Sequence, residues 1–289
     1  MDTTAWNRVR RAVLVVFAAL TAVLLGIIGY RRRQFDREIE DTVESLLAGA
    51  ESTGHDTEDS TDWAELPAPV RRYFDTALVD TDREIRTVRL RQRGEFRLGG
   101  RDAAWRPLEA TQHVRVSPPG FVWDAQIDVL PLVPARVIDS YSDGDGTLEA
   151  RLLSVLPVAT AGPSDEMNEG ELVRYLAEAV WYPTALLPAN GVEWTGIDDR
   201  SAMATLEHDG TTASVVFHFD DNDEVSRVTT DRYRQEADAY APWTGYFRNY
   251  ENHDGRHVPT AATVEWNLPD GDLEYWRATV TELDYTDGE

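Results

Sequence analysis

The sequence predicts a mainly β (α+β) fold: a strongly curved antiparallel sheet or half-barrel of about eleven strands, with two amphipathic helices as a lid or plug. Three observations predict it. From Glu84 onward the apolar residues recur every second position, which is typical of strands with one buried and one wet face. Turn signals such as Asp209-Gly210 separate most of the apolar runs, so alternating βα units are not expected. Eleven strands are too many for a flat open sheet, which is therefore expected to curl.

An apolar segment at residues 12–30 is the first element. Its 19 residues carry no charge, close to the roughly 20 that cross a bilayer core. A cleaved signal peptide has a shorter apolar region and a small-residue cleavage site, and Gly29-Tyr30-Arg31 is a poor one. We therefore predict a transmembrane anchor over residues 1–33, which places the protein in the cell membrane as a single-pass protein.

The membrane orientation is left open by the sequence. Three arginines precede the apolar segment and four follow it, which favours a cytoplasmic C-terminal side. Against this, Arg10-Arg11-Ala12-Val13-Leu14 resembles a twin-arginine export signal. Between the two we favour an extracellular C-terminal domain.

Two segments connect the anchor to the rest of the chain. Residues 34–50 carry an apolar stripe and predict an amphipathic stalk helix. Residues 51–62 are polar and acidic and predict a linker. We assign 34–62 to the stalk helix and acidic linker, and 63–289 to the curved antiparallel β domain.

The β domain is expected to contain two helices and eleven strands. Pro67 and Pro69 open a helix over 67–79. A second helix over 169–181 is expected to have Asn168 as its N-cap, Glu171 in a capping box, and Pro183 beyond its end. The strands are expected near 85–98, 103–117, 120–129, 135–142 and 146–156, and after the second helix near 192–198, 201–208, 211–220, 224–234, 257–268 and 272–285.

Composition limits the chemistry that this chain can perform. Of its 289 residues 52 are acidic and 28 basic, and all the basic ones are arginine. The absence of cysteine and lysine excludes disulfides, thiolate metal sites and Schiff-base chemistry. The net charge of −24 makes nucleic-acid binding unexpected, because phosphate contacts need a positive field. This acidic, lysine-free composition resembles that of haloarchaeal, halophilic proteins, in which concentrated salt screens the repulsion between carboxylates.

Aromatic residues are the candidate ligand contacts. Trp181 and Tyr182 end a lid-like helix, where amphipathic rings can line a pocket mouth. The alternative, which we favour, is packing at a corner of the core. The ligand-binding candidates are Trp123, Tyr175, Trp181, Tyr182, Trp194 and Trp243.

Two carboxylates are the weak catalytic candidates. Asp124 is expected on the wet face of its strand beside Trp123, where a large ring can raise the pKa of a carboxyl and suit it to acid catalysis. Glu171 and Arg174 stand three residues apart on the second helix and can face the cavity as a polar handle. A solvated aspartate and a surface ion pair are the favoured alternatives.

Four arginines on one face of the first strand are the candidate anion or partner contact. Arg89, Arg91, Arg93 and Arg97 can bind an anionic head group or phosphate. In so acidic a chain, pairing with cross-strand carboxylates is the favoured alternative.

No metal or cofactor is predicted. His253 and His257 are close in the sequence but lack the helical His-Glu-x-x-His spacing. The Asp-rich stretches at 143–146 and 220–223 are explained by hairpin turns. The chain also lacks a phosphate-binding loop, a dinucleotide fingerprint and a Gly-x-Ser-x-Gly elbow.

The block Trp-Tyr-Pro-Thr-Ala-Leu-Leu-Pro at 181–188 carries a family resemblance. Together with Gly120-Phe-Val-Trp-Asp124 and further blocks at 156–159, 170–175 and 231–234, it resembles an uncharacterised family of archaeal and bacterial membrane-anchored proteins over most of residues 64–285. That resemblance implies no activity. The element order is similar to the Lol-type lipoprotein carriers, which implies a half-barrel with a helical lid that binds lipid or acyl chains.

The sequence therefore favours a membrane-anchored binding protein rather than an enzyme. We expect it to contact the membrane through residues 12–30 and to hold a lipid or another hydrophobic small molecule in the concave face of the sheet. Two alternatives stay open. One is an enzyme of the hydrolase or isomerase type that uses Asp124, Glu171 or a histidine. The other is a cell-envelope interaction module that binds a partner through the arginine face.

Overall fold

A single antiparallel sheet of 13 strands forms the body of the protein. The structure, a computed structural model, describes residues 3–51, 63, 65–79, 83–130 and 133–288. The strands are β1 Ile85–Arg97, β2 Trp105–Arg115, β3 Gly120–Leu130, β4 Val133–Ser142, β5 Asp145–Leu152, β6 Leu156–Ala161, β7 Val192–Asp198, β8 Ser201–His208, β9 Thr211–Phe219, β10 Val225–Arg234, β11 Ala239–His253, β12 Arg256–Leu268 and β13 Gly271–Asp287.

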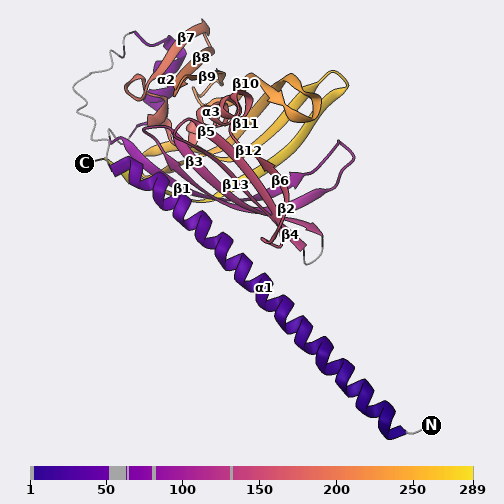
Figure 1. Cartoon of the computed structure of the whole chain (residues 1–289). Coiled ribbons are helices and arrows are strands. Elements are labelled where there is room, and N and C mark those ends of the chain that lie inside the picture. The colour runs from indigo at the N-terminus through magenta and orange to yellow at the C-terminus, as the bar shows by residue number, and fades with distance from the viewer. Residues whose placement is uncertain (1–2, 52–62, 64, 80–82, 131–132, 289) are drawn as a thin grey trace.

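The chain enters this sheet at its centre. β1 lies between β2 and β13, and consecutive strands lead outward from it to the edge strand β6. The helix α3 (Asp165–Glu178) then carries the chain to the other edge at β7, from which β8 to β13 lead back to β1. α3 contacts β4 and β5 in one half and β9 and β10 in the other, so the sheet curves around it (Figure 1).

The predicted fold class is confirmed, with two strands more than expected. The expected strand over 146–156 ends at Leu152, because Leu153 and Ser154 adopt positive φ angles of 54° and 60° and reverse the chain into β6. This turn contains no glycine, proline, asparagine or aspartate, the stronger turn signals, so the sequence did not reveal it. β11 was missed because it contains Pro242 and Gly245, which are unusual inside a central strand.

The helices differ from their predicted boundaries at one important point. α2 spans Ala68–Ala77, within the expected range. α3 begins four residues earlier than expected, because Ser164 is its N-cap and accepts a hydrogen bond from the backbone N–H of Met167. The predicted N-cap, Asn168, instead accepts a hydrogen bond from the Gly146 N–H at 2.8 Å. Pro183 follows α3 as expected but opens a short 3-10 turn, η2 (Pro183–Leu186).

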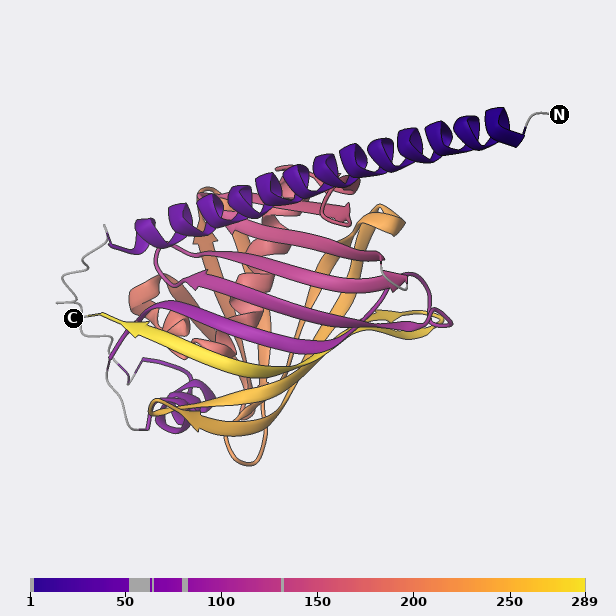
Figure 2. The same ribbon diagram turned by 90° about the horizontal axis from the view of Figure 1, so that it is seen from below.

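The N-terminal helix α1 is continuous from Thr3 to Glu51. Its second half is packed on the outer face of β2 and β3, where Phe35, Ile39 and Leu46 are buried (Figure 2). The segment expected to be a stalk thus contacts the sheet directly, and the Phe35 ring lies against the guanidinium groups of Arg136 and Arg151. The predicted linker lies almost wholly outside the described residues, and the domain boundaries at 33 and 62 stay a prediction.

The concave side of the sheet is filled at one end only. One end of the sheet is the end at which β1, β3, β5, β10 and β12 terminate, and we call it the hairpin end. At the opposite end, α2, α3 and the 3-10 turns pack against the strands through a core that includes Tyr73, Phe74, Leu172 and Tyr182. Among the described residues no helix fills the concave side toward the hairpin end, and a cavity lies there.

Candidate ligand cavity

A cavity of about 990 Å³ lies between α3 and the concave face of the sheet. This volume lies within the usual range for small-molecule sites, which is about 300–1,000 Å³. Its walls are mainly apolar, and its aromatic lining consists of Phe96, Trp123, Trp181, Tyr233, Trp243, Phe247, Trp266, Tyr275 and Trp276. The rim includes Leu98, Gly99 and Gln235, which lie just beyond the strand ends at the hairpin end.

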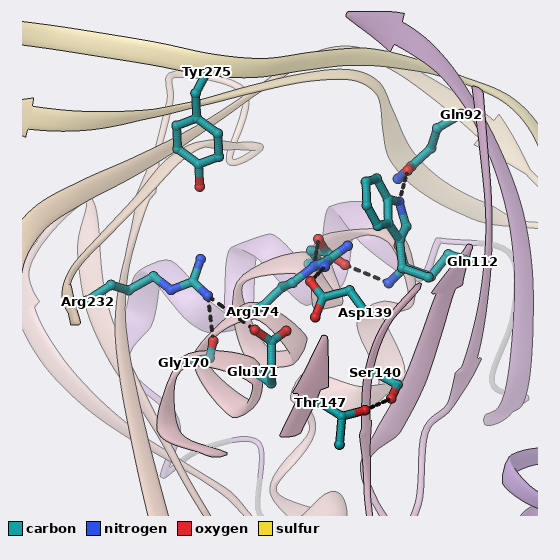
Figure 3. A network of polar contacts seen from close by, with 12 residues as sticks. Gln92, Gln112, Asp139, Ser140, Thr147, Gly170, Glu171, Arg174, Arg232 and Tyr275 are labelled. Carbon is teal, nitrogen blue, oxygen red and sulfur yellow. Dashed lines mark hydrogen bonds and ion pairs between the residues drawn. The ribbon is translucent and has the colours of Figure 1, made fainter. Parts of the chain in front are cut away.

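Arg174 is the centre of a buried polar cluster on the α3 side of the cavity (Figure 3). Its Nε donates to Glu178 Oε1 at 2.8 Å and its Nη1 donates to Asp139 Oδ2 of β4 at 2.5 Å. The guanidinium also lies 4.8 Å and 4.9 Å from the ring centroids of Phe121 and Trp123. Two carboxylates and two rings therefore compensate the buried charge of Arg174.

Arg232 of β10 is less well compensated. Its Nη2 donates to the backbone carbonyl of Gly170 at 2.8 Å, and Glu171 Oε1 lies 3.8 Å away, too far for a hydrogen bond. Nearby, Trp243 Nε1 donates to the hydroxyl of Tyr275 at 2.9 Å. Figure 3 shows Tyr275 and Arg232 pointing into the same open space above α3.

Glu171 carries an unpartnered oxygen inside the cavity. Its side chain is 7% exposed, and Oε2 has no hydrogen-bond partner among the described residues. Burial, together with the negative charge of Asp139, raises the pKa of Glu171 to about 8, although Arg174 and Arg232 oppose the shift. Glu171 is therefore mainly protonated at neutral pH and can donate a hydrogen bond. Burial likewise raises the pKa of Asp139, and Arg174 opposes that rise.

Two buried glutamines extend the cluster across β1 and β2. Trp123 Nε1 donates to Gln92 Oε1 at 2.8 Å, and Gln112 Nε2 donates to Glu178 Oε2 at 2.6 Å. Sequence reasoning missed both glutamines, together with Asp139 and Tyr275. A signal was available: Gln92, Gln112 and Asp139 occupy inward positions in strands whose other inward residues are mostly apolar.

The six predicted aromatic contacts divide into two groups. Trp123, Trp181 and Trp243 line the cavity, and their ligand role stays a prediction. The other three lie outside its lining and take part in core packing. The Tyr175 hydroxyl donates to the Val116 carbonyl, the Tyr182 hydroxyl to the Tyr175 carbonyl, and the Trp194 indole to the Leu186 carbonyl.

The two catalytic candidates lie on opposite sides of the sheet. Asp124 is outside the cavity and accepts two hydrogen bonds, at 2.8 and 2.7 Å, from Arg136 of the neighbouring strand. Glu171 faces the cavity. The favoured surface ion pair between Glu171 and Arg174 is wrong, because α3 is enclosed by the sheet and both side chains are buried. Across the described ranges, no three His, Asp or Glu side chains gather as metal ligands.

Most of the arginine face of β1 is paired on the outer surface. Arg89 lies 3.0 Å from Asp284, Arg91 3.2 Å from Glu282, and Arg93 3.0 Å from Glu109. These contacts match the cross-strand pairing that was the favoured alternative. Arg97 differs, because it lies at the cavity rim with its guanidinium 4.3 Å from the ring centroid of Trp105.

α1 runs along the outer face toward the hairpin end. Near the opposite end, Leu46 accepts a hydrogen bond from Arg115, the last residue of β2. At the hairpin end, the Phe35 ring lies 3.8 Å from the guanidinium of Arg151, one residue before the end of β5. The N-terminal half of α1 continues past the sheet at this end (Figure 2).

This projecting half is long and apolar enough to cross a membrane, and most of its side chains from Leu14 to Tyr30 are exposed. An anchor and a signal sequence share these properties.

The cavity rim also lies at the hairpin end. The rim and the projecting helix are therefore at the same end of the protein.

Curved sheet and internal cavity together define a half-barrel protein with room for a small-molecule ligand. The chain belongs to the family of unknown function DUF6920, whose sequence profile matches residues 64–285. This confirms the expected membership of an uncharacterised family. No curated protein matches the chain.

Several solved structures are similar in fold. A LolA-superfamily protein from Nitrosomonas europaea is 12% identical with a TM-score of 0.41, covering 76% of this chain and 93% of that one. The lipoprotein LppX from Mycobacterium tuberculosis is 14% identical with a TM-score of 0.25, covering 75% and 93%. A β-barrel-like DUF1849 protein from Brucella abortus is 10% identical with a TM-score of 0.24, covering 71% and 100%.

Proposed function

We propose that this protein is a membrane-anchored binding protein that holds a lipid or another hydrophobic chain in its cavity. The cavity of about 990 Å³ with mainly apolar walls is the observation that carries the proposal. Each methylene removed from water contributes about 0.8 kcal/mol, so ten contribute about 8 kcal/mol. That free energy corresponds to a dissociation constant near 1 μM before the costs of ordering are subtracted.

The direction of α1 supports a ligand that comes from the membrane. If its projecting apolar half spans the bilayer, the hairpin end of the sheet faces the membrane surface, and so does the cavity rim. Exposed leucines at this end add support, since isolated apolar side chains at a bilayer surface can bury themselves among lipids. These are Leu98, Leu130, Leu153 and Leu156, which are 40–59% exposed.

Lipid extraction tests this proposal. The full-length protein is purified in detergent and exchanged into amphipol, and its bound lipids are extracted and identified by mass spectrometry. We expect a near-stoichiometric apolar or amphipathic molecule. Ala150→Trp places a ring in the cavity and should remove that molecule, whereas Thr279→Trp on the exposed outer face should not. A wild-type protein without bound lipid, or an Ala150→Trp variant that keeps it, contradicts the proposal.

An enzyme of the hydrolase type is a second candidate, favoured by one observation. Glu171 is a buried carboxyl whose raised pKa suits a general acid at neutral pH. Catalysis would be supported over binding if the molecule extracted from the wild type is chemically altered and the molecule extracted from Glu171→Gln is not.

A further inference from the structure

We infer that the cavity recognises an amphiphile with an anionic oxygen head group, a carboxylate or phosphate, which binds between Arg232, Tyr275 and Glu171 beside α3. The inference depends on the proposed function and names the class of ligand. Three features carry it: an undercompensated cation, a set of converging donors, and a polarity gradient along the cavity.

Arg232 is the undercompensated cation. Arg174 next to it has a hydrogen bond to each of two carboxylates. Arg232 has one hydrogen bond, to a neutral carbonyl, and its guanidinium lies 5.4 Å from the ring centroid of Trp243. The Arg232 side chain is 14% exposed, so water compensates little of its charge. Burial of a guanidinium is costly unless hydrogen bonds and an opposite charge accompany it. The remaining Arg232 donors face the cavity, where an anionic ligand can supply both.

Converging donors make the site selective for an acceptor. The Tyr275 hydroxyl accepts from Trp243 and keeps its own proton to donate. When Glu171 is protonated, its single O–H can be donated from the unpartnered oxygen Oε2. With Arg232 these groups surround one open space (Figure 3). A carboxylate or phosphate accepts from all three, whereas an ammonium head group can accept from none.

The charge of the cluster is compatible with an anion while Glu171 is protonated. Asp139 and Glu178 then balance Arg174 and Arg232, so the five side chains sum to zero. Ionisation of Glu171 makes the sum negative and repels an anionic head group. The groups that face Glu171 are Asp139 from β4, Arg174 and Glu178 from α3, Arg232 from β10 and Tyr275 from β13.

Polarity changes along the cavity in the direction that a membrane lipid requires. The charged cluster lies at α3, and the walls between it and the rim carry Phe96, Trp266, Leu273 and Trp276. The charged residues Arg97, Arg234 and Glu236 lie at the rim itself, at the ends of β1 and β10. A bound amphiphile therefore directs its alkyl chain toward the hairpin end. A lipid in a bilayer at that end presents its head group first, and head-first entry brings the head group to α3 with the chain behind it.

Four probes of one chain length test the inference: decanoate, decyl phosphate, decanol and decylamine. Binding to the full-length protein in amphipol is measured by isothermal titration calorimetry at pH 6.5 and checked by tryptophan fluorescence. Decanoate or decyl phosphate, or both, should bind at least about tenfold more tightly than decanol, because hydrogen bonds to charged groups are the strong ones. The two anions distinguish a carboxylate from a phosphate site.

Arg232→Gln should reduce the affinity for the anions to that for decanol and leave decanol binding unchanged, which also shows that the variant is folded. Tyr275→Phe should weaken anion binding less, and the exposed Arg89→Gln should change nothing. The head-group inference is overturned if the wild type binds decanol or decylamine as tightly as it binds the two anions. It is also overturned if Arg232→Gln still prefers the anions. In both cases the proposed function stands. Failure of all four probes to bind overturns both.

Discussion

Arginine–carboxylate pairs occur on both faces of the sheet, and their surroundings differ sharply. On the outer face Arg89, Arg91 and Arg93 pair with carboxylates at 3.0–3.2 Å, but at least a third of each side chain is exposed. On the inner face Arg174 and Arg232 are about 15% exposed. Exposed pairs contribute about 0–1 kcal/mol because water and salt screen them. Loss of one partner from a buried pair costs about 3–5 kcal/mol.

The comparison explains why similar residues serve different purposes. The outer pairs organise charge on a strongly acidic surface, and each can be lost with little effect. The inner cluster needs every partner, and its incompletely satisfied members, Glu171 and Arg232, are the groups that a ligand can complete. Four predictions test this difference, from the largest expected effect to the smallest.

Asp139→Ala should have the largest effect. It removes one of the two carboxylates bonded to buried Arg174. We expect a loss of about 3–5 kcal/mol in stability and a melting temperature lower by roughly 10 °C. Differential scanning calorimetry of the full-length protein in amphipol measures it. The matched outer variant Asp284→Ala should lose less than about 0.5 kcal/mol, and equal losses for the two variants would contradict the comparison.

Glu171 should make stability and binding depend on pH. Its folded-state pKa of about 8 lies above the ordinary value of 4.5, so its contribution to stability is complete below pH 4.5 and is lost as the pH rises to about 8. Above pH 8, the affinity for decanoate should fall about tenfold, because ionised Glu171 repels the carboxylate of the ligand. A tenfold change in affinity corresponds to the free energy of a shift of one pKa unit.

Glu171→Gln, which cannot ionise, should flatten both profiles. Calorimetry between pH 5 and 9 measures them in parallel for the two proteins. Identical pH profiles for wild type and variant would mean that Glu171 does not ionise in this range.

The exposed leucines should affect ligand transfer more than affinity. Leu130→Gln with Leu156→Gln removes two apolar contacts at the hairpin end. We expect transfer of a fluorescent fatty acid from phosphatidylcholine vesicles to slow by a few-fold, because each lost side chain weakens lipid contact by about 1 kcal/mol. Affinity for soluble decanoate should not change. Equal transfer rates for the wild type and the double variant would contradict the proposal that a bilayer faces the hairpin end.

Arg89→Gln should have the smallest effect. It removes an ion pair whose partners are both well exposed. Stability should change by less than about 0.5 kcal/mol, and decanoate affinity should stay the same. A large loss of affinity would revive the hypothesis that the outer arginine face binds an anion.

Much of the fold could be predicted because its signals are local. The alternation in β3 and the proline-opened helix α2 are each visible within about ten residues. β11 could not be predicted in the same way, because Pro242 is tolerated where β11 pairs with β10 alone, one residue before its pairing with β12 begins at Trp243, and only the tertiary structure sets that register. Of the site, Trp123, Trp181, Trp243 and Glu171 were among the candidates, and Asp139 and Tyr275 were not.

The sequence by itself determined the antiparallel class, most of the strand positions, the apolar N-terminal helix and the surplus of carboxylates. Each of these follows from residue type and short-range periodicity. Only the tertiary structure decided which charges are buried together. Asp139 and Arg174 are 35 residues apart, and Gly170 and Arg232 are 62 apart. They meet because α3 crosses inside the curled sheet, and the desolvation that makes their chemistry distinctive depends on that enclosure.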